Sequence, residues 1–339
     1  EYFFNSFTVT NSTLNVNQDG VLKVHAYNIT IDDSSQIIAT GMGYDGGAGG
    51  NKDGNDGQGP GVGCFGVHSP GEENLILDNE ELTLDEGLYR FNQLILSNNS
   101  TLYLGEVASI NGGSLIIHAA TIEIDQSSKI VVDGKGGRGG PGRIVSGYDG
   151  EPATGGGFGG VGGDGENDTY GGDGGATFGS LEEKHCRMGG GGGGGAGDNS
   201  SSYGGDGGYG GGAIKLYGTT VNINGTVSAN GENATAGTTV HCGGGGGGGG
   251  GTIVIKGKNV TIADNALIAR GGNGGARGGT DSGVGGGGGG GRIKIFYETG
   301  NVTANHDVSR GLDGDGGSTW VGEDGSIYSF DTTMRIDTP

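Results

Sequence analysis

Apolar and polar residues alternate in five similar segments of the chain, and the apolar positions of each segment fall into three pairs. The segments begin at Gly20, Gly113, Gly212, Gly251 and Gly291. In the second segment the pairs are Leu115 with Ile117, Ile122 with Ile124, and Ile130 with Val132. A period of two places both members of a pair on one face of a strand, and the polar residues between pairs are enough for a turn. The pattern predicts three short strands per segment, which together form one triangular coil.

Such coils are expected to stack. A single coil cannot bury its apolar face, whereas stacked coils form a continuous core when each strand pairs with its equivalent about 4.8 Å away. Strand-like segments at 7–16, 73–84 and 88–104 are expected to add partial coils. We therefore predict an all-β chain in which residues 1–339 form one elongated domain, a parallel β-helix.

These repeats, which include the sequence GGGGGGGRIKIFYE around Gly291, resemble known proteins. The pattern is similar to the right-handed β-helix superfold of pectin-lyase-like enzymes, phage tailspikes and surface adhesins. It most resembles the glycine-rich β-helix repeats of large secreted proteins in protists, plants and some bacteria. The resemblance covers most of the chain and implies right-handed coils, but fold analogy alone does not assign an activity.

Glycine supplies 89 of the 339 residues and gathers in excursions between the coils. The excursions span residues 41–63, 134–212, 231–251 and 271–291. Collagen is excluded, because the glycines lack a strict three-residue period and the chain has only 5 prolines. The excursions are either flexible linkers or a polyglycine II layer beside the β-helix, in which backbone groups bond to neighbouring segments. Similarity to the polyglycine bundles of springtail antifreeze proteins and phage tail-fibre tips favours the layer.

A net charge of −21 opposes a phosphate-binding surface, and no apolar run approaches the roughly 20 residues that span a bilayer. We expect no nucleic-acid partner and no membrane insertion.

Asn-x-Ser/Thr triplets are more frequent than chance gives. They begin at Asn11, Asn28, Asn98, Asn99, Asn167, Asn199, Asn224, Asn233, Asn259 and Asn301. The triplets predict N-glycans, a eukaryotic secretory pathway with the export signal removed, and an extracellular or cell-surface location.

Three triplets, at Asn28, Asn259 and Asn301, are expected to occupy the same position in their repeats. The last two would then lie on adjacent coils about 4.8 Å apart.

The three cysteines favour a disulfide. Cys186 and Cys242 each follow a histidine and precede a glycine run, so a bond between them would hold the two runs in register. Cys64 is then free or bonded to another subunit. The alternatives are free thiols and a zinc or copper site that includes His68, His185 and His241, but the spacing matches no metal motif, and we assign no metal.

Acidic glycine-rich segments raise calcium as an alternative to solvated loops. Their aspartates are Asp45, Asp53, Asp56, Asp164, Asp168, Asp313 and Asp315. Calcium takes six to eight oxygen ligands, but the spacing fails the EF-hand pattern. We expect no cofactor, with calcium as the alternative.

Catalysis is not expected. Glu123, Asp125, Asp133 and Arg143 are candidates for a pectinase-like face, but no spacing identifies an acid and a base. No Ser-His-Asp signature is present, and no Gly-Lys-Ser/Thr follows the glycine runs.

The favoured function is that of a secreted structural glycoprotein, which self-associates through the β-helix ends as the repeating subunit of a fibril, surface appendage or coat. The alternative is an adhesin that binds extracellular polysaccharide through aromatic residues in the longest excursion. Those residues are Tyr148, Phe158, Tyr170, Phe178, Tyr203 and Tyr209. Ice binding and polysaccharide degradation are less favoured.

Overall fold

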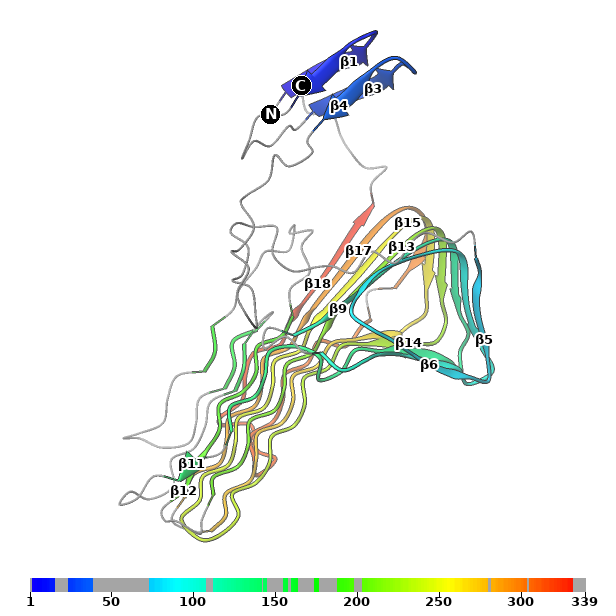
Figure 1. The fold of residues 1–339 in the computed structure, drawn as a ribbon. Coiled ribbons are helices and arrows are strands. Elements are labelled where there is room, and N and C mark those ends of the chain that lie inside the picture. Colours follow the sequence, from blue (N-terminus) through cyan, green and yellow to red (C-terminus); the bar gives the residue numbers. More distant parts are fainter. Residues whose placement is uncertain are drawn as a thin grey trace, which may run out of the picture. The chain divides into compact units, whose positions relative to one another are not determined.

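A computed structural model describes residues 2–15, 24–38, 73–107, 112–141, 143–144, 155–157, 160–163, 174–176, 188–197, 203–279, 282–303 and 305–331. The chain divides into two compact units, Glu1–Cys64 and Phe65–Pro339 (Figure 1). The prediction of one continuous domain stays a prediction.

The first unit consists of four parallel strands. They are β1 (Tyr2–Val9), β2 (Thr13–Asn15), β3 (Val24–Ile31) and β4 (Gln36–Ile38). β1 pairs with β3 and β2 pairs with β4, so the chain passes twice through the same two positions. The strands expected in segment 7–16 are therefore present.

The second unit contains two larger parallel sheets. The seven-stranded sheet has the order β18 (Ser326–Asp331), β17 (Arg292–Val302), β15 (Thr252–Ile262), β13 (Ala213–Ile223), β9 (Ser114–Ile124), β7 (Gly87–Ser97) and β5 (Leu75–Asp78). The five-stranded sheet has the order β16 (Leu267–Ile268), β14 (Thr226–Ser228), β10 (Lys129–Val131), β8 (Thr101–Leu104) and β6 (Glu81–Leu84). A further short pair joins β11 (Arg143–Ile144) to β12 (Ala196–Gly197).

All ladders between these named strands are parallel, and no helix occurs among the described residues. The prediction of an all-β chain with parallel strands is confirmed. Accordingly, the described part of the chain contains no helix long and apolar enough to cross a membrane.

The first four repeats each contribute two strands, where the sequence predicted three, and the fifth contributes β17 and an isolated bridge from Asp307 to Ile268. β9 carries the first two apolar pairs on one strand of 11 residues, and β10 carries Ile130 of the third pair, with Val132 directly after it. Between the two pairs the strict alternation of buried residues fails, since Ala119 and Ile122 are both buried although three positions apart. The strands curve along their length (Figure 1), so a change of direction is made within a continuous ladder rather than by a turn.

The predicted apolar pairs form the core. All six residues of the second repeat and all six of the fourth are at most 1% exposed. They stack in register, so that Leu115 lies between Gly87 and Ile214, and Ile253 lies between Ile214 and Ile293. Burying one such side chain contributes about 1.5–3 kcal/mol relative to exposure.

The fifth repeat has a different register from the one expected. Asn259 pairs with Thr299, and Thr261 pairs with Asn301. The two Asn-x-Thr triplets are therefore offset by two residues, about 7 Å along the strand. Gly300, whose φ is 142°, takes the position opposite Val260 that a buried apolar residue holds in the other repeats.

Glycine segments lie side by side outside the two sheets (Figure 1). We call them the glycine bundle: residues 134–140, 155–157, 160–163, 188–195, 203–212, 231–237, 243–251, 271–278 and 283–291. The run Gly243–Gly251 shows its organisation. Every third N–H donates to the same neighbour, with N···O distances of 2.7–3.1 Å. One segment accepts from Gly243, Gly246 and Gly249, and a second accepts from Gly244, Gly247 and Gly250. A third segment accepts from Gly245, Gly248 and Gly251.

The same run accepts hydrogen bonds from three further segments, through Gly208, Gly272 and Gly156 among others. Six segments therefore surround it. A side chain cannot fit in this arrangement, because a Cβ built on Gly247 would lie 2.0 Å from the carbonyl oxygen of Gly272.

Outer segments of the bundle carry side chains at every third position. In residues 203–211, Tyr203, Asp206 and Tyr209 are exposed, whereas all the glycines between them are buried. The three-residue period thus places side chains on the surface and bare backbone inside.

Candidate binding cleft

A cleft of about 1400 Å³ lies on the outward face of the seven-stranded sheet. Its main row crosses six strands in register and consists of Arg90, His118, Tyr217, Lys256, Phe296 and Phe330. These residues project outward because the adjacent Ile117, Leu216 and Ile255 face the core, and successive side chains of a strand point to opposite faces.

Aromatic rings line much of the cleft. His118 and Tyr217 meet edge to face, with ring centroids 4.9 Å apart. Tyr328 contacts both Phe296 and Phe330, with centroid distances of 6.0 and 6.2 Å. Lys256 separates these two aromatic groups in the register of the sheet.

The cleft concentrates positive charge in an acidic chain. Its described lining includes Arg90, Lys256 and Lys258, with Glu298 as the one acidic side chain. Arg90, Lys256 and Lys258 are exposed, and none forms an ion pair with a residue that the structure describes. Burial lowers the pKa of His118, and the charges of Arg90 and Lys215 lower it further. The cleft is therefore a positive and aromatic surface.

Seven of the ten predicted glycosylation sites have described side chains, and all seven are exposed. They are Asn11, Asn98, Asn99, Asn224, Asn233, Asn259 and Asn301. Asn28 lies in β3, but its side chain, like all of Asn167 and Asn199, lies outside the described residues. Glycosylation stays a prediction.

Cys242 is buried at the start of a glycine run, where its Sγ lies 3.3 Å from Thr239 Oγ1. Cys64 and Cys186 lie outside the described residues, as do His68 and His185. The Cys186–Cys242 disulfide stays a prediction.

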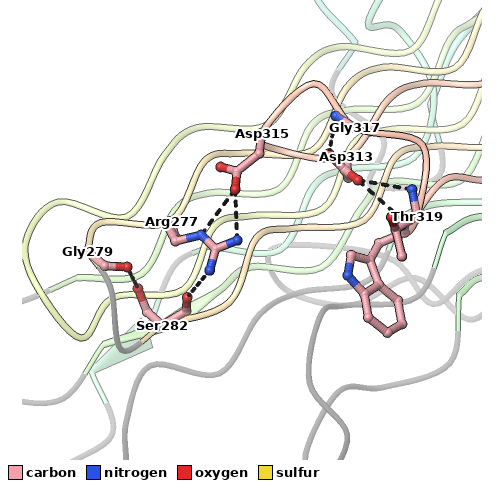
Figure 2. Close-up of polar contacts among 8 residues, drawn as sticks. Arg277, Gly279, Ser282, Asp313, Asp315, Gly317 and Thr319 are labelled. Carbon is pink, nitrogen blue, oxygen red and sulfur yellow. Dashed lines mark hydrogen bonds and ion pairs between the residues drawn. The ribbon is translucent and has the colours of Figure 1, made fainter.

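Two of the calcium candidates are described, and N–H donors hold both carboxylates (Figure 2). Asp313 accepts from Gly317 N–H at 2.6 Å and from Thr319 N–H at 3.3 Å, while Asp315 pairs with Arg277 at 2.7 Å. Within the described ranges, no group of three or more His, Cys, Asp and Glu side chains is placed to hold a metal ion. Asp45, Asp53, Asp56, Asp164 and Asp168 lie outside those ranges.

Two of the candidate catalytic carboxylates, Asp125 and Asp133, serve turns, whereas Glu123 lies within β9. Burial raises the pKa of Asp125, but hydrogen bonds from Ser128, Asn98 N–H and Ser127 outweigh it and lower the pKa to about 2. A carboxyl group that ionises at this pH is a poor general acid near neutrality. Asp133 accepts a hydrogen bond from Asn230 N–H at 2.7 Å, across to the next repeat.

Asp32 of the first unit repeats the role of Asp125, since it accepts from Asn11 N–H and from Ser34. These hydrogen bonds lower the pKa of Asp32, led by one from Ser35 and opposed by burial. The two units therefore share one kind of turn, in which an aspartate accepts hydrogen bonds from an asparagine N–H and from a nearby serine.

Of the predicted aromatic residues, Tyr203 and Tyr209 are described, and both are exposed on the glycine bundle rather than in the cleft. Tyr148, Phe158, Tyr170 and Phe178 lie outside the described residues. The cleft was not predicted from the sequence, although a signal was present. His118, Tyr217, Lys256 and Phe296 each directly follow the first apolar pair of their repeat.

Comparison of the chain with protein-family models, with curated proteins and with solved structures gives no match.

Proposed function

We propose that this protein is a secreted, non-catalytic structural glycoprotein of the cell exterior, which forms the repeating subunit of a fibril, surface appendage or coat. Its core is a right-handed parallel β-helix, since parallel crossover connections are almost always right-handed. The glycine bundle is a polyglycine II layer, for which the three-residue period and the six neighbours of Gly243–Gly251 are the support.

The observation that carries this proposal is the pair of edge strands in the large sheet. β18 and β5 each have one strand neighbour in the described part of the chain. An edge strand offers free N–H and C=O groups to another chain, and head-to-tail docking that does not close produces a filament. Ile76, half exposed on β5, adds apolar surface at one end.

Ser329 allows the β18 edge to be tested. Ser326 N–H donates to Gly291 at the start of β17. In a parallel ladder alternate residues point their backbone groups to the same side, so Ser329 N–H points away from β17. Ser329→Pro then removes an edge donor and leaves the β17 ladder intact, and Ser329→Ala is the matched control.

The experiment is electron microscopy of the natively secreted protein and both variants at near-neutral pH. Wild type and Ser329→Ala are expected to form regular filaments, and Ser329→Pro shorter ones or none. Monomers of the wild type over a wide concentration range would overturn the proposal. Filaments unaffected by Ser329→Pro would overturn the role of β18.

A further inference from the structure

We propose that the cleft on the seven-stranded sheet binds an acidic polysaccharide, with the carboxylates on Arg90, Lys256 and Lys258 and the sugar rings against Tyr217, Phe296 and Phe330. The cleft uses side chains on the outward face of the sheet, whereas docking would use the backbone edge of β18, so the inference does not depend on filament formation although Phe330 lies on that edge strand.

The size of the cleft favours an extended ligand. Its volume of about 1400 Å³ exceeds the roughly 300–1,000 Å³ of small-molecule pockets. The row from Arg90 to Phe330 spans six neighbouring strands, about 24 Å at the strand spacing. That spacing is close to the advance per residue of an extended polysaccharide, so successive side chains can meet successive sugars.

The chemistry of the row suits a sugar acid. Aromatic rings offer flat apolar faces, and Lys256 lies between Tyr217 and Phe296 in the register. Three exposed cations against one acid attract negative charge, although the whole chain carries −21. Because screening limits interactions between exposed charges to about 8 Å at physiological salt, the local cations dominate over the distant acids.

A polysaccharide fits better than a nucleic acid. Tight nucleic-acid binding commonly uses six to ten phosphate contacts, and the described lining of the cleft supplies three permanent cations. In the row only Lys256 lies between aromatic rings, so its cations are spaced too widely to follow a continuous phosphate backbone.

The test is calorimetric titration of the full-length protein with hexamannuronate and with its carboxyl-reduced, neutral counterpart. We expect the acid to bind at least tenfold more tightly. Replacing both cleft lysines, as Lys256→Gln with Lys258→Gln, should weaken binding by about tenfold per lysine, because each replacement removes a charge-assisted hydrogen bond to a carboxylate. Lys129→Gln, an exposed lysine on the other sheet, is the control and should leave affinity unchanged.

The lysine side chains are exposed, so their replacement is expected to preserve the thermal midpoint and the circular dichroism spectrum. Phe296→Ala should weaken binding without changing its salt dependence. Equal affinity for the acid and neutral hexasaccharides, or unchanged affinity in the double lysine variant, would overturn the proposal. So would binding of a single-stranded oligothymidylate as tight as that of hexamannuronate, since the cleft would then be a nonspecific polyanion surface.

Discussion

Glycine at single positions decides whether the bundle can form. Its segments approach so closely that backbone atoms of one segment occupy the place of a side chain on the next. The N–H groups of the central run, Gly243–Gly251, donate to carbonyl oxygens of neighbouring segments. Glycine loses more conformational freedom on folding than any other residue, so these hydrogen bonds must offset that cost.

Gly247→Ala is therefore expected to destabilise the protein by more than about 3 kcal/mol, at or beyond the usual cost of overpacking. Its Cβ would meet the Gly272 carbonyl at 2.0 Å, with backbone rather than a movable side chain in the way. Gly190→Ala is the matched control, because its nearest heavy atom lies 3.0 Å away. Thermal unfolding measures both, and equal midpoints for the two variants would contradict the packing described for the central run.

His306 predicts a dependence of stability on pH. The residue is buried, and neither ring nitrogen has a hydrogen-bond partner among the described residues. It precedes Asp307, which bridges to Ile268 at the end of the five-stranded sheet. Burial lowers the pKa of His306, opposed by the charge of Asp264. Because the folded pKa lies below the unfolded value near 6.5, the stabilisation is complete above about pH 6.5 and is lost as pH falls through the folded pKa.

His306→Leu should accordingly lose less thermal stability than wild type between pH 7.5 and pH 5. His118→Gln provides the comparison, since the pKa of His118 is also lowered but its side chain is only partly buried. Melting curves at the two pH values give the result, and a pH dependence in His306→Leu as steep as that of wild type would rule out this residue as the cause.

At the scale of strands and glycine segments, the sequence predicts the core well. The pairs Leu115 with Ile117 and Ile253 with Ile255 are buried as the period of two requires. It did not predict that one strand carries two pairs, because residues 118–121, His-Ala-Ala-Thr, fit a turn and a bent strand equally. The shifted register of the fifth repeat could not be predicted either, since Asn-Val-Thr recurs in β15 and β17 while the ladder pairs Asn259 with Thr299.

The cleft escaped prediction for a related reason. Its residues are chemically unlike one another, so only the ladder of pairs shows that His118, Tyr217, Lys256 and Phe296 form one row. Apolar pairs can be recognised from the sequence because they repeat at a fixed spacing. The residues of the cleft row come from different strands and share no such spacing.

The three-residue period of the outer glycine segments gives an element-scale prediction. Inserting one glycine between Gly207 and Gly208 moves Asp206 onto the position of Gly205, where a Cβ would lie 2.0 Å from the Thr235 carbonyl oxygen. Inserting three glycines restores the phase, because a segment with three residues per turn then presents the same face.

We expect the single insertion to lower the thermal midpoint much more than the triple insertion, although it adds less chain. Hydrogen exchange of the bundle amides should show the same order. A triple insertion that destabilises as much as the single one would mean that length, rather than phase, governs the bundle.

For the whole molecule, charge sets how copies meet one another and their ligands. Each chain carries −21, so copies that dock end to end repel, while an acidic polysaccharide is drawn to the cations of one cleft. Raising NaCl from about 0.1 M to about 1 M shortens the screening length from about 10 Å to about 3 Å. Salt therefore weakens both the repulsion between copies and the attraction of the polysaccharide to the cleft. The first effect favours assembly, and the second opposes ligand binding.

Filament length should therefore increase with salt, whereas affinity for hexamannuronate should fall, and the double lysine variant should show a shallower fall than wild type. Light scattering follows assembly and calorimetry follows binding on the same preparations, with the neutral hexasaccharide as the control for nonelectrostatic salt effects. Assembly that weakens with salt would mean that opposite charges, rather than the backbone edges of β5 and β18, join the copies. Salt-independent binding of hexamannuronate would remove Arg90, Lys256 and Lys258 from the recognition of its carboxylates.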